Sequence, residues 1–527
     1  MTGAPELRPY QREAIDAVLA ARRAGIKRMV VCLPTGAGKT VIFSHLARLA
    51  RKQVLVLAHR EELLAQARDK LERALEGTRV VALERGTSRA PAEAKVLVAS
   101  LRSLHDDRLG HVLAGRDLGL VIYDECHHAA ADDNLRILRQ IGAFEPDWPG
   151  TLLGFTATTA RGDGKGLDQV FERIVYSRTL PDLIDGGYLA PLKGFRINTA
   201  ADLTRIAPGA SDFSDVDLAE AVDIEDRNAL VSRSIQELAR DRRTIAFCVT
   251  VNHARNLARA LDAIGVPAGI VHGEMPAADR AKALAEFRAG RIQVIANVAV
   301  LTEGFDDPGV SCIAMARPTR SEGMYAQCIG RGTRLAEGKR DCLILDFVDV
   351  SNLSLCTLPS LFGCPRDLDL RGGDVGDARA TWLQLMLDHA GFELEAGALT
   401  LREIQDRAAS FDPLTLAPNL EVRAISGNAW FSLGRHGVGL HFERFPGHPI
   451  AATVLRRGDR GKLWEVELDG RAIDRFSTLE QAVEAVDYEI DQMGRRASAS
   501  ARDDAAWRAN RADALRLAVW HAVTRRR

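Results

Sequence analysis

The sequence predicts an α/β protein in which two parallel-sheet domains stand in tandem and a C-terminal α+β region follows them. Between residues 28 and 349, short β-branched apolar runs alternate with helical patterns, which is the arrangement of parallel βαβ units. This alternation occurs twice and stops near residue 350. The chain has 527 residues, enough for roughly three or four domains at about 100 to 200 residues each.

The apolar runs are predicted as central strands, because each is short, rich in Val, Ile and Leu, and bounded by turns. The first sheet is expected from residues 29–33, 54–58, 96–100, 120–123 and 152–155, and the second from 244–249, 269–271, 294–296, 311–315 and 342–346. We therefore expect a first domain over residues 1–190, a second over 191–352 and an accessory region over 353–527.

Two stretches outside these runs also carry patterns. Residues 198–226 are rich in Ala, Asp and Ser and are predicted to form a connection or surface insertion, although 192–197 is a candidate first strand of the second sheet. Residues 427–469 alternate apolar and polar positions in three runs separated by Gly, Pro and Asp, and a helical pattern follows at 478–490. This favours a small antiparallel sheet with a packed helix.

Composition excludes several classes of protein. Hydrophobic residues make up 46% and charged residues 27%, which is typical of soluble globular proteins and excludes wholesale disorder and a collagen-like repeat. Lys and Arg total 70 against 71 for Asp and Glu, a net charge of -1. Any basic surface that binds nucleic acid is therefore expected to be local.

Cysteine usage and the N-terminus predict a cytoplasmic protein without a membrane partner. The eight cysteines form no CxxC pair and no zinc-ligand spacing, so they are expected to be reduced and buried. Cys356 and Cys364 are the only pair close enough in sequence to suggest a metal site, and two thiolates are too few. The first ten residues lack the pattern of a signal peptide, and no apolar run approaches the ~18 residues of a membrane span.

A glycine-rich loop follows the first predicted strand and leads into a helical pattern at 41–50. Such a loop wraps around phosphates, with backbone N–H groups and a helix N-terminus facing them. Lys39 is expected to reach the outer phosphates, and the Thr40 hydroxyl to ligate Mg²⁺. Leu33 stands where the general pattern has its first glycine. The loop residues predicted to bind nucleotide are Pro34, Thr35, Gly36, Ala37, Gly38, Lys39 and Thr40.

The run 120–123 ends in Asp124, Glu125, Cys126 and His127. Carboxylates at the C-terminal end of a buried parallel strand lie where open α/β sheets bind ligands. Asp124 is predicted to hold Mg²⁺ through water, and Glu125 to orient and deprotonate an attacking water. Alone, the tetrapeptide is equally compatible with an ordinary helix start, and the preceding phosphate loop favours the catalytic interpretation.

Two arginines in the second half, Arg331 and Arg334, are spaced to lie on one helix face, where both can reach an anion. An arginine finger accelerates phosphoryl transfer by roughly 10³ to 10⁵. A solvated basic face is the alternative for such a pair alone. The phosphate loop favours the catalytic interpretation.

Together these residues resemble superfamily 2 DExH-box helicases and translocases, in the branch that includes RadD-like and XPB-like proteins. The resemblance spans about residues 7–349 and implies two RecA-like domains, ATP and Mg²⁺. It implies that residues 7–11 recognise adenine, with Gln11 reading the base and Tyr10 or Arg8 lining the pocket. The catalytic set implied is Lys39, Asp124, Glu125, His127, Gln327, Arg331 and Arg334.

The resemblance also assigns roles in coupling. Thr156, Ala157 and Thr158 are expected to link hydrolysis to domain movement, and Thr159 stands in place of the family's usual proline. Gly304 and Asp306 are expected near the nucleotide. Residues 246–250 resemble a further motif of the second domain. Arg334 is the preferred finger, Arg331 the second γ-phosphate contact, and Gln327 a candidate bridge to His127.

Nucleic-acid contacts are expected in loops at strand ends, where small hydroxyls and N–H groups contact phosphates without reading sequence. The alternative at each position is an ordinary cap or turn. The predicted contacts are His59, Arg60, Ser100, His272, Gly273 and Thr302.

The last 36 residues contain nine arginines, interleaved with Trp507 and Trp520. This predicts either a basic helix that binds phosphates or a solvated helix whose tryptophans pack in a core.

The predicted function is an ATP-dependent nucleic-acid helicase or translocase. The resemblance favours DNA over RNA, and repair or recombination as the process. The alternatives are a duplex-DNA translocase that remodels protein–DNA complexes without unwinding, an RNA helicase, and a motor that serves a C-terminal module binding nucleic acid or protein partners.

Overall fold

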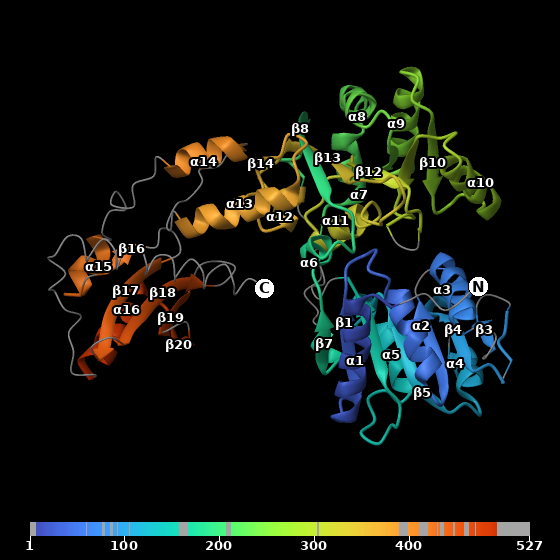
Figure 1. Ribbon diagram of the computed structural model, residues 1–527, viewed down its shortest axis with the longest axis horizontal. Coiled ribbons are helices and arrows are strands. Elements are labelled where there is room, and N and C mark those ends of the chain that lie inside the picture. The colour runs from blue at the N-terminus through green and yellow to red at the C-terminus, as the bar shows by residue number, and fades with distance from the viewer. Residues whose placement is uncertain are drawn as a thin grey trace. The chain divides into compact units, whose positions relative to one another are not determined.

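The computed structural model describes residues 7–58, 61–75, 80–84, 88–91, 93–104, 106–157, 167–206, 212–302, 305–388, 399–409, 420–428, 430–432, 437–445, 448–457, 463–468 and 471–492. The chain divides into two compact units (Figure 1). The first comprises residues 1–366 and 370–376, and the second comprises 367–369 and 377–527.

The first unit opens with a seven-stranded sheet in the order β3-β4-β2-β5-β6-β1-β7. Every neighbouring pair is parallel. The central strands are buried along almost their whole length, as expected for a sheet covered on both faces. Its strands are β1 (Arg28–Cys32), β2 (Gln53–Ala58), β3 (Val81–Glu84), β4 (Val96–Ser100), β5 (Leu118–Asp124), β6 (Leu152–Thr156) and β7 (Arg173–Ser177), and its helices include α1 (Pro9–Arg23), α2 (Lys39–Leu49), α3 (Glu61–Leu75), α4 (Asp106–Leu113) and α5 (Asp132–Gln140).

The five predicted central strands of this sheet are confirmed, whereas the strands at its two edges, β3 and β7, were not predicted. An edge strand is covered less completely and therefore needs no continuous apolar run. In β7 every residue is exposed or half-buried, and Ile174 is 46% exposed. Residue pattern alone does not distinguish such a segment from a loop.

The second sheet has six parallel strands in the order β10-β11-β9-β12-β13-β8. The candidate strand at 192–197 is confirmed as part of β8. The strands are β8 (Leu192–Asp202), β9 (Arg243–Phe247), β10 (Ala268–His272), β11 (Val294–Val298), β12 (Val310–Met315) and β13 (Cys342–Val350), and the helices are α7 (Asp215–Val222), α8 (Glu225–Leu238), α9 (Val251–Ala263), α10 (Ala277–Arg288) and α11 (Glu322–Ile329).

The stretch 198–226 is more ordered than the predicted connection. β8 continues through it to Asp202, and α7 follows. Leu203, Phe213 and Leu218 are buried in a small core that also takes Leu355 from beyond the second sheet. The sequence pattern did not predict this core, because the three apolar residues are widely spaced in a stretch of mostly polar and small residues.

The segment after β13 packs on the second sheet. α12 (Leu358–Leu361) begins with buried Leu358, whose N–H donates to Asp346 Oδ2 at 2.8 Å. Gly194 in β8 exchanges backbone hydrogen bonds with Gly372 and Gly373. The structure therefore places residues up to 366, and 370–376, with the first unit, beyond the boundary at 352 that the sequence predicts. Further elements are β14 (Leu368–Asp369), α13 (Val375–Asp388), β15 (Leu399–Thr400) and α14 (Leu401–Ala409).

The second unit contains the predicted antiparallel sheet with a packed helix, which is thereby confirmed. Its strands follow the chain order β16-β17-β18-β19-β20, and all pairs are antiparallel. Val483 and Val486 of α16 pack with Val454 and Val466 of the sheet. The predicted basic helix lies outside the described residues. The elements are α15 (Leu420–Ile425), β16 (Phe431–Ser432), β17 (Gly437–Phe445), β18 (His448–Arg457), β19 (Leu463–Leu468), β20 (Arg471–Phe476) and α16 (Leu479–Gln492).

The eight cysteines are free thiols; seven are buried and Cys356 is half-buried. Within the described ranges no group of three or more His, Cys, Asp or Glu side chains is arranged to hold a metal ion. No helix of the described part of the chain is both long and apolar enough to span a bilayer. The cytoplasmic location stays a prediction.

Candidate active site

The phosphate loop connects β1 to α2 as predicted. Gly36 and Gly38 adopt left-handed φ angles of 89° and 75°. A Cβ at Gly38 would lie 2.7 Å from Gln11 Nε2, and one at Gly36 would lie 3.0 Å from Thr333 Oγ1. Both the backbone angle and the crowding require glycine. The loop therefore wraps closely onto the N-terminus of an 11-residue helix, whose N–H groups favour an anion.

Lys39 of this loop forms an ion pair with Glu125, with Nζ 2.8 Å from Oε1 and side-chain exposures of 11% and 9%. Glu125 follows the end of β5 in a left-handed conformation, φ 51°. For a residue with a side chain this conformation costs roughly 1 to 3 kcal/mol, a strain typical of functional sites. Its N–H donates to Asp124 Oδ1 at 3.1 Å, which ties the two predicted acidic residues together.

Electrostatics keep both partners ionised. Burial raises the pKa of Glu125, but Lys39 and His127 lower it by more, so that it lies well below its ordinary value. Burial lowers the pKa of Lys39, whereas Glu125 and Asp124 raise it, and the net shift is upward. The site is thus a charged pair buried beside the phosphate loop.

The predicted magnesium residues suit that ion chemically. Thr40 supplies a hydroxyl and Asp124 a carboxylate, and Mg²⁺ prefers oxygen ligands, commonly one or two carboxylates together with phosphates and waters. Both residues are half-buried, Thr40 in the first turn of α2 and Asp124 at the end of β5. Buried Glu125 Oε2 has no hydrogen bond of normal geometry among the described residues, and His127 Nδ1 lies 3.4 Å from it.

His127 connects the acidic residues to the end of the neighbouring strand β6. Its Nδ1 lies 3.3 Å from Thr156 Oγ1 and 3.4 Å from Glu125 Oε2. Ala157 follows Thr156 directly, and Thr158 lies outside the described residues. The bridge from Gln327 to His127 stays a prediction: Gln327 is buried in α11, and no hydrogen bond joins the two side chains.

Residues at the start of α1 contact the other side of the loop. Tyr10 OH donates to Ala37 O at 2.6 Å, and Gln11 Nε2 donates to the same carbonyl at 3.2 Å. Arg8 Nη1 donates to Tyr188 O at 2.9 Å. The rings of Tyr10 and Tyr188 meet edge to face with centroids 4.8 Å apart. Tyr188 therefore belongs to the predicted adenine region, although no local pattern marks it.

The two arginines do not lie on a helix face, which corrects the prediction. α11 ends at Ile329 with Gly330 as its C-cap, so both arginines stand in the following turn. Arg331 is buried and donates to Thr302 O from Nε (3.1 Å) and Nη2 (2.6 Å), and to Phe305 O from Nη1 (2.9 Å). Its positive charge makes a small contribution against the net upward shift of the Lys39 pKa, which Glu125 and Asp124 cause.

Arg334 and Lys70 share one carboxylate. Arg334 Nη1 lies 2.9 Å from Asp306 Oδ1, and Lys70 Nζ lies 2.9 Å from Asp306 Oδ2. Burial raises the pKa of Asp306, but the two cations lower it by more, so the net shift is downward. Lys70 lies in α3, beside the first sheet, whereas Asp306 and Arg334 belong to the domain of the second sheet. The cluster therefore joins residues of both parallel-sheet domains. Gly304 lies outside the described residues.

The turn that carries the arginines lies against the phosphate loop. A Cβ at Gly330 would come within 2.6 Å of Thr35 Cβ. The Thr333 hydroxyl donates to Gly330 O at 3.0 Å, and Thr35 Oγ1 is buried without a hydrogen-bond partner among the described residues. Thr333 was not among the predicted site residues, because only the folded chain brings it to Gly36.

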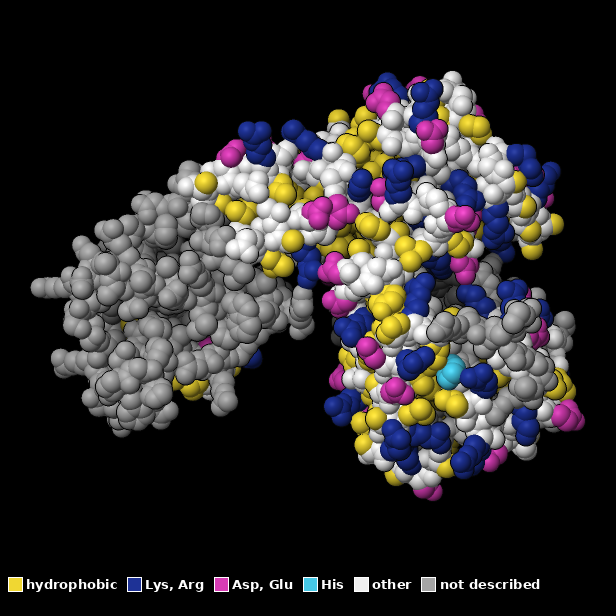
Figure 2. All heavy atoms as spheres, in the orientation of Figure 1, with side chains coloured by type: hydrophobic (Ala, Val, Ile, Leu, Met, Phe, Trp, Pro, Cys, Tyr) yellow, Lys and Arg dark blue, Asp and Glu magenta, His cyan; other side chains and the backbone are white. Residues whose placement is uncertain are grey.

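The predicted nucleic-acid residues lie at strand ends where they are described. Ser100 ends β4, His272 ends β10, and Gly273 follows it; His59 and Arg60 lie outside the described residues. Thr302 Oγ1 donates to Ala299 O at 2.9 Å, so this hydroxyl serves its own loop. The roles in binding stay predictions. On the face seen in Figure 2, Lys and Arg side chains are interspersed with Asp and Glu.

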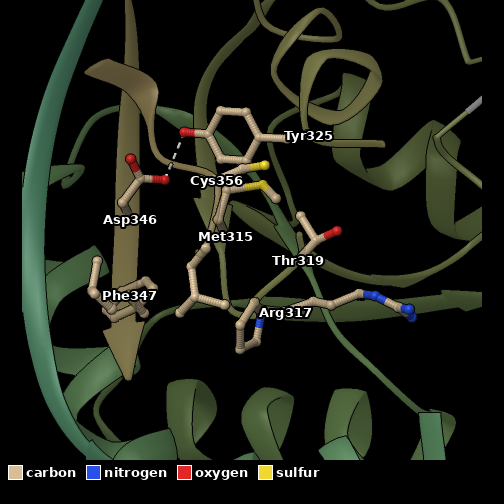
Figure 3. Close-up of a pocket in the computed structure, with 10 residues that line it drawn as sticks. Met315, Arg317, Thr319, Tyr325, Asp346, Phe347 and Cys356 are labelled. Atoms are coloured by element: carbon tan, nitrogen blue, oxygen red, sulfur yellow. Dashed lines mark hydrogen bonds between the residues drawn. The ribbon is translucent and has the colours of Figure 1, made fainter. Parts of the chain in front are cut away.

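Residues of α11, β12 and β13, together with the segments that follow β12 and β13, line a small pocket (Figure 3). Tyr325 of α11 points across it and donates its hydroxyl to Asp346 Oδ1 at 2.7 Å. Cys356 lines the same pocket, and its N–H donates to Thr319 O at 2.9 Å. The helix that precedes the arginines is thus bonded to β13, and the residue after the sheet, Cys356, is bonded to the loop before that helix.

Two sequence families match the chain. Residues 4–161 match the family described as "Type III restriction enzyme, res subunit", and residues 226–336 match "Helicase conserved C-terminal domain". The first match contains the phosphate loop and Glu125, and the second contains Arg331 and Arg334.

Individual proteins are similar over the same region. "Putative mitochondrial ATP-dependent helicase irc3" of Schizosaccharomyces pombe is 37% identical over 69% of this chain and 61% of its own length. "DNA 3'-5' helicase XPB" of Kineococcus radiotolerans is 28% identical over 62% and 57%. The chain therefore spans about three fifths of each. A solved fragment of a "putative HsdR subunit of a type I restriction enzyme" from Vibrio vulnificus YJ016 has a TM-score of 0.51, with 24% identity over 65% of both chains.

Proposed function

Because the chain belongs to the superfamily 2 helicases, in their type III restriction and XPB-like branch, we propose that it couples ATP hydrolysis to movement along nucleic acid. Its two parallel sheets are the RecA-like domains of that family. Because the chain spans only part of each relative, the substrate and process of the whole protein belong to the proposal.

One observation carries the proposal: Lys39 of the phosphate loop forms an ion pair with Glu125, and the turn with Arg331 and Arg334 packs against that loop. In this proposal Lys39 binds phosphate, Glu125 is the base, and Arg331 and Arg334 complete the site. No single domain supplies this set, so opening and closing of the domains makes and breaks the site.

Each residue of the proposed site has its own role in ATP hydrolysis. Lys39 and the N–H groups of α2 bind the outer phosphates, and Arg334 neutralises charge that develops on the transferred group. As Lys39 moves its hydrogen bonds to phosphate, Glu125 loses its strongest cationic partner. Its pKa then rises, which makes it a better base for the attacking water. Thr40 and Asp124 would hold Mg²⁺, which neutralises phosphate charge when bound.

DNA is the proposed substrate, in repair or recombination. The similarity to a protein named as a DNA helicase supports DNA over RNA. Strand-end residues such as Ser100 and His272 are proposed to contact phosphates, and protein partners are proposed for the C-terminal unit.

The test of the motor function is ATP hydrolysis by the full chain and by Lys39→Ala and Glu125→Gln. Both variants are expected to lose hydrolysis, by roughly 10² or more for the missing base, while their circular dichroism matches the wild type. Exposed His111→Ala on α4 is the matched control and keeps full activity. Normal turnover by either variant of the pair contradicts the proposal.

The substrate is tested by comparing ATPase stimulation by single-stranded, duplex and forked DNA and by RNA at one salt concentration, since phosphate-driven binding depends steeply on salt. Strand displacement on the fork separates a helicase from a translocase, which clears bound proteins but leaves the duplex paired. Stimulation by RNA alone contradicts the choice of DNA.

A further inference from the structure

Lys39 is not the only lysine whose ammonium serves the site. Lys339 lies five positions after Arg334, beyond the tight turn at Gly338, φ 76°. Its Nζ lies within hydrogen-bond distance of four backbone carbonyls: Val310 O (2.5 Å), Gly332 O (2.5 Å), Arg334 O (2.8 Å) and Pro308 O (3.3 Å). A surface lysine normally points into water, so this arrangement asks for an explanation.

The four carbonyls belong to two segments of the site. Gly332 and Arg334 stand in the arginine turn, whereas Pro308 and Val310 follow Asp306. The Arg334 side chain joins the same two segments from the other end, through Phe305 O at 3.1 Å and Asp306 Oδ1 at 2.9 Å. Lys339 thus ties the backbone of Arg334 to the segment that its guanidinium contacts.

Lys339 is half-buried. An ammonium that donates to carbonyls in such a place makes strong, charge-assisted hydrogen bonds but loses part of its hydration. Burial accordingly lowers the pKa of Lys339. If the contacts served only to close this turn, a neutral hydrogen-bond donor could make them without burying a charge. Two of the carbonyls that Lys339 contacts belong to the turn that carries Arg334, and the other two follow the Asp306 carboxylate that the Arg334 guanidinium contacts.

We infer that Lys339 is a positioning residue for ATP hydrolysis: its ammonium clamps the turn after α11 and thereby aims Arg334 at the transferred phosphate. The inference rests on the proposed function, since it gives Arg334 the role of the finger. Lys339 itself touches no substrate. It therefore governs the rate of the chemical step and leaves nucleotide binding unchanged.

The chain offers a matched control. Lys27 Nζ also donates to two carbonyls, Pro146 O (2.8 Å) and Trp148 O (2.7 Å), at the base of β1 and away from the phosphate loop. Lys27→Met removes a carbonyl-binding ammonium without touching the site. It reports the effect of losing such a lysine on stability alone.

The experiment measures kcat and KM for ATP in the full chain and in Lys339→Met, Lys339→Arg, Lys27→Met, Arg334→Ala and the double variant Lys339→Met/Arg334→Ala. Lys339→Met is expected to lower kcat about tenfold, part of the 10³ to 10⁵ of a finger, with KM within about twofold. Lys339→Arg recovers part of the loss, and Lys27→Met keeps the wild-type kcat. The double variant is no slower than Arg334→Ala, because Lys339 acts through that residue.

Several outcomes overturn the inference: a wild-type kcat in Lys339→Met, full additivity in the double variant, an equal loss in Lys27→Met, or a normal kcat in Arg334→Ala. If Lys339→Met does not fold, Lys339→Gln, which keeps two N–H donors, decides by the same kcat and KM comparison. If the wild type does not hydrolyse ATP, the proposed function itself is rejected. If the wild type is active and the Lys339 variants have the same kcat, only this inference is rejected.

Discussion

The ammonium of Lys39 and the carboxylate of Glu125 lie 2.8 Å apart, with side-chain exposures of 11% and 9%, so the phosphate-binding lysine is paired with the proposed catalytic base. The same contact therefore has two consequences. It stabilises two charges that the loop would otherwise bury alone, and it holds the pKa of Glu125 low until phosphate competes for Lys39.

Lys39→Ala is expected to lower the free energy of unfolding by about 3 kcal/mol, because it leaves the Glu125 carboxylate buried without its partner. Glu125→Gln added to Lys39→Ala restores part of that loss by removing the unpaired charge. Urea unfolding of the single and double variants measures the coupling. Strict additivity of the two changes means that the ion pair contributes nothing to stability.

Thr156→Val is expected to reduce DNA movement per ATP hydrolysed and to leave basal hydrolysis close to normal. The hydroxyl of Thr156 lies 3.3 Å from His127 Nδ1, and this contact links the acidic residues to the end of β6. Valine keeps the shape and removes the hydroxyl. The measurement is strand displacement or translocation divided by phosphate released; an unchanged ratio contradicts the coupling role.

Gln11→Ala is expected to raise KM for ATP about fivefold, the value of one hydrogen bond, and to weaken the preference of the enzyme for ATP over other nucleoside triphosphates. Gln11 accepts from Arg8 N at 3.0 Å and donates to Ala37 O, so its amide is oriented beside the loop. Steady-state hydrolysis of ATP, GTP and CTP tests this. An equal rise in KM for all three shows that Gln11 supports the loop and does not read the base.

Asp346→Asn is expected to remove a pH dependence of stability. Burial raises the pKa of Asp346 to about 6, although hydrogen bonds from Leu358 and Tyr325 lower it. The folded protein thus binds this proton more tightly than the unfolded chain, so the associated stability is present below about pH 4 and is lost as pH rises through 6. The wild type should lose up to about 3 kcal/mol relative to the variant over that interval, and parallel curves contradict the assignment.

A chain that ends at residue 376 is expected to fold stably, whereas a chain that ends at residue 352 is expected to be destabilised. The shorter chain loses Leu355 and Leu358, which are buried on the second sheet, and the Leu358 N–H that Asp346 accepts. Thermal unfolding should show cooperative melting for 1–376 and a lower midpoint for 1–352. If 1–376 hydrolyses ATP with the DNA preference of the full chain, the second unit does not set substrate choice.

Local patterns in the sequence determined the central strands, the phosphate loop and the carboxylates after β5. In each case a short run dictates its own conformation: burial selects the apolar strand, and left-handed angles select Gly36 and Gly38. Such features need only neighbours along the chain. The antiparallel sheet of the second unit followed from alternation in the same way.

Tertiary structure alone decided which distant groups meet. It brought Tyr188 to Tyr10, Thr333 to Gly36 and Lys70 to Asp306, and it ended α11 before the arginines, so that Arg331 binds carbonyls. These contacts join segments that are far apart in the chain. The local sequence of either segment does not indicate which distant segment will pack against it. The sequence thus determined the elements and the chemistry available, whereas packing decided the partners of each charge, because a buried charge takes whichever group the fold places within hydrogen-bond reach.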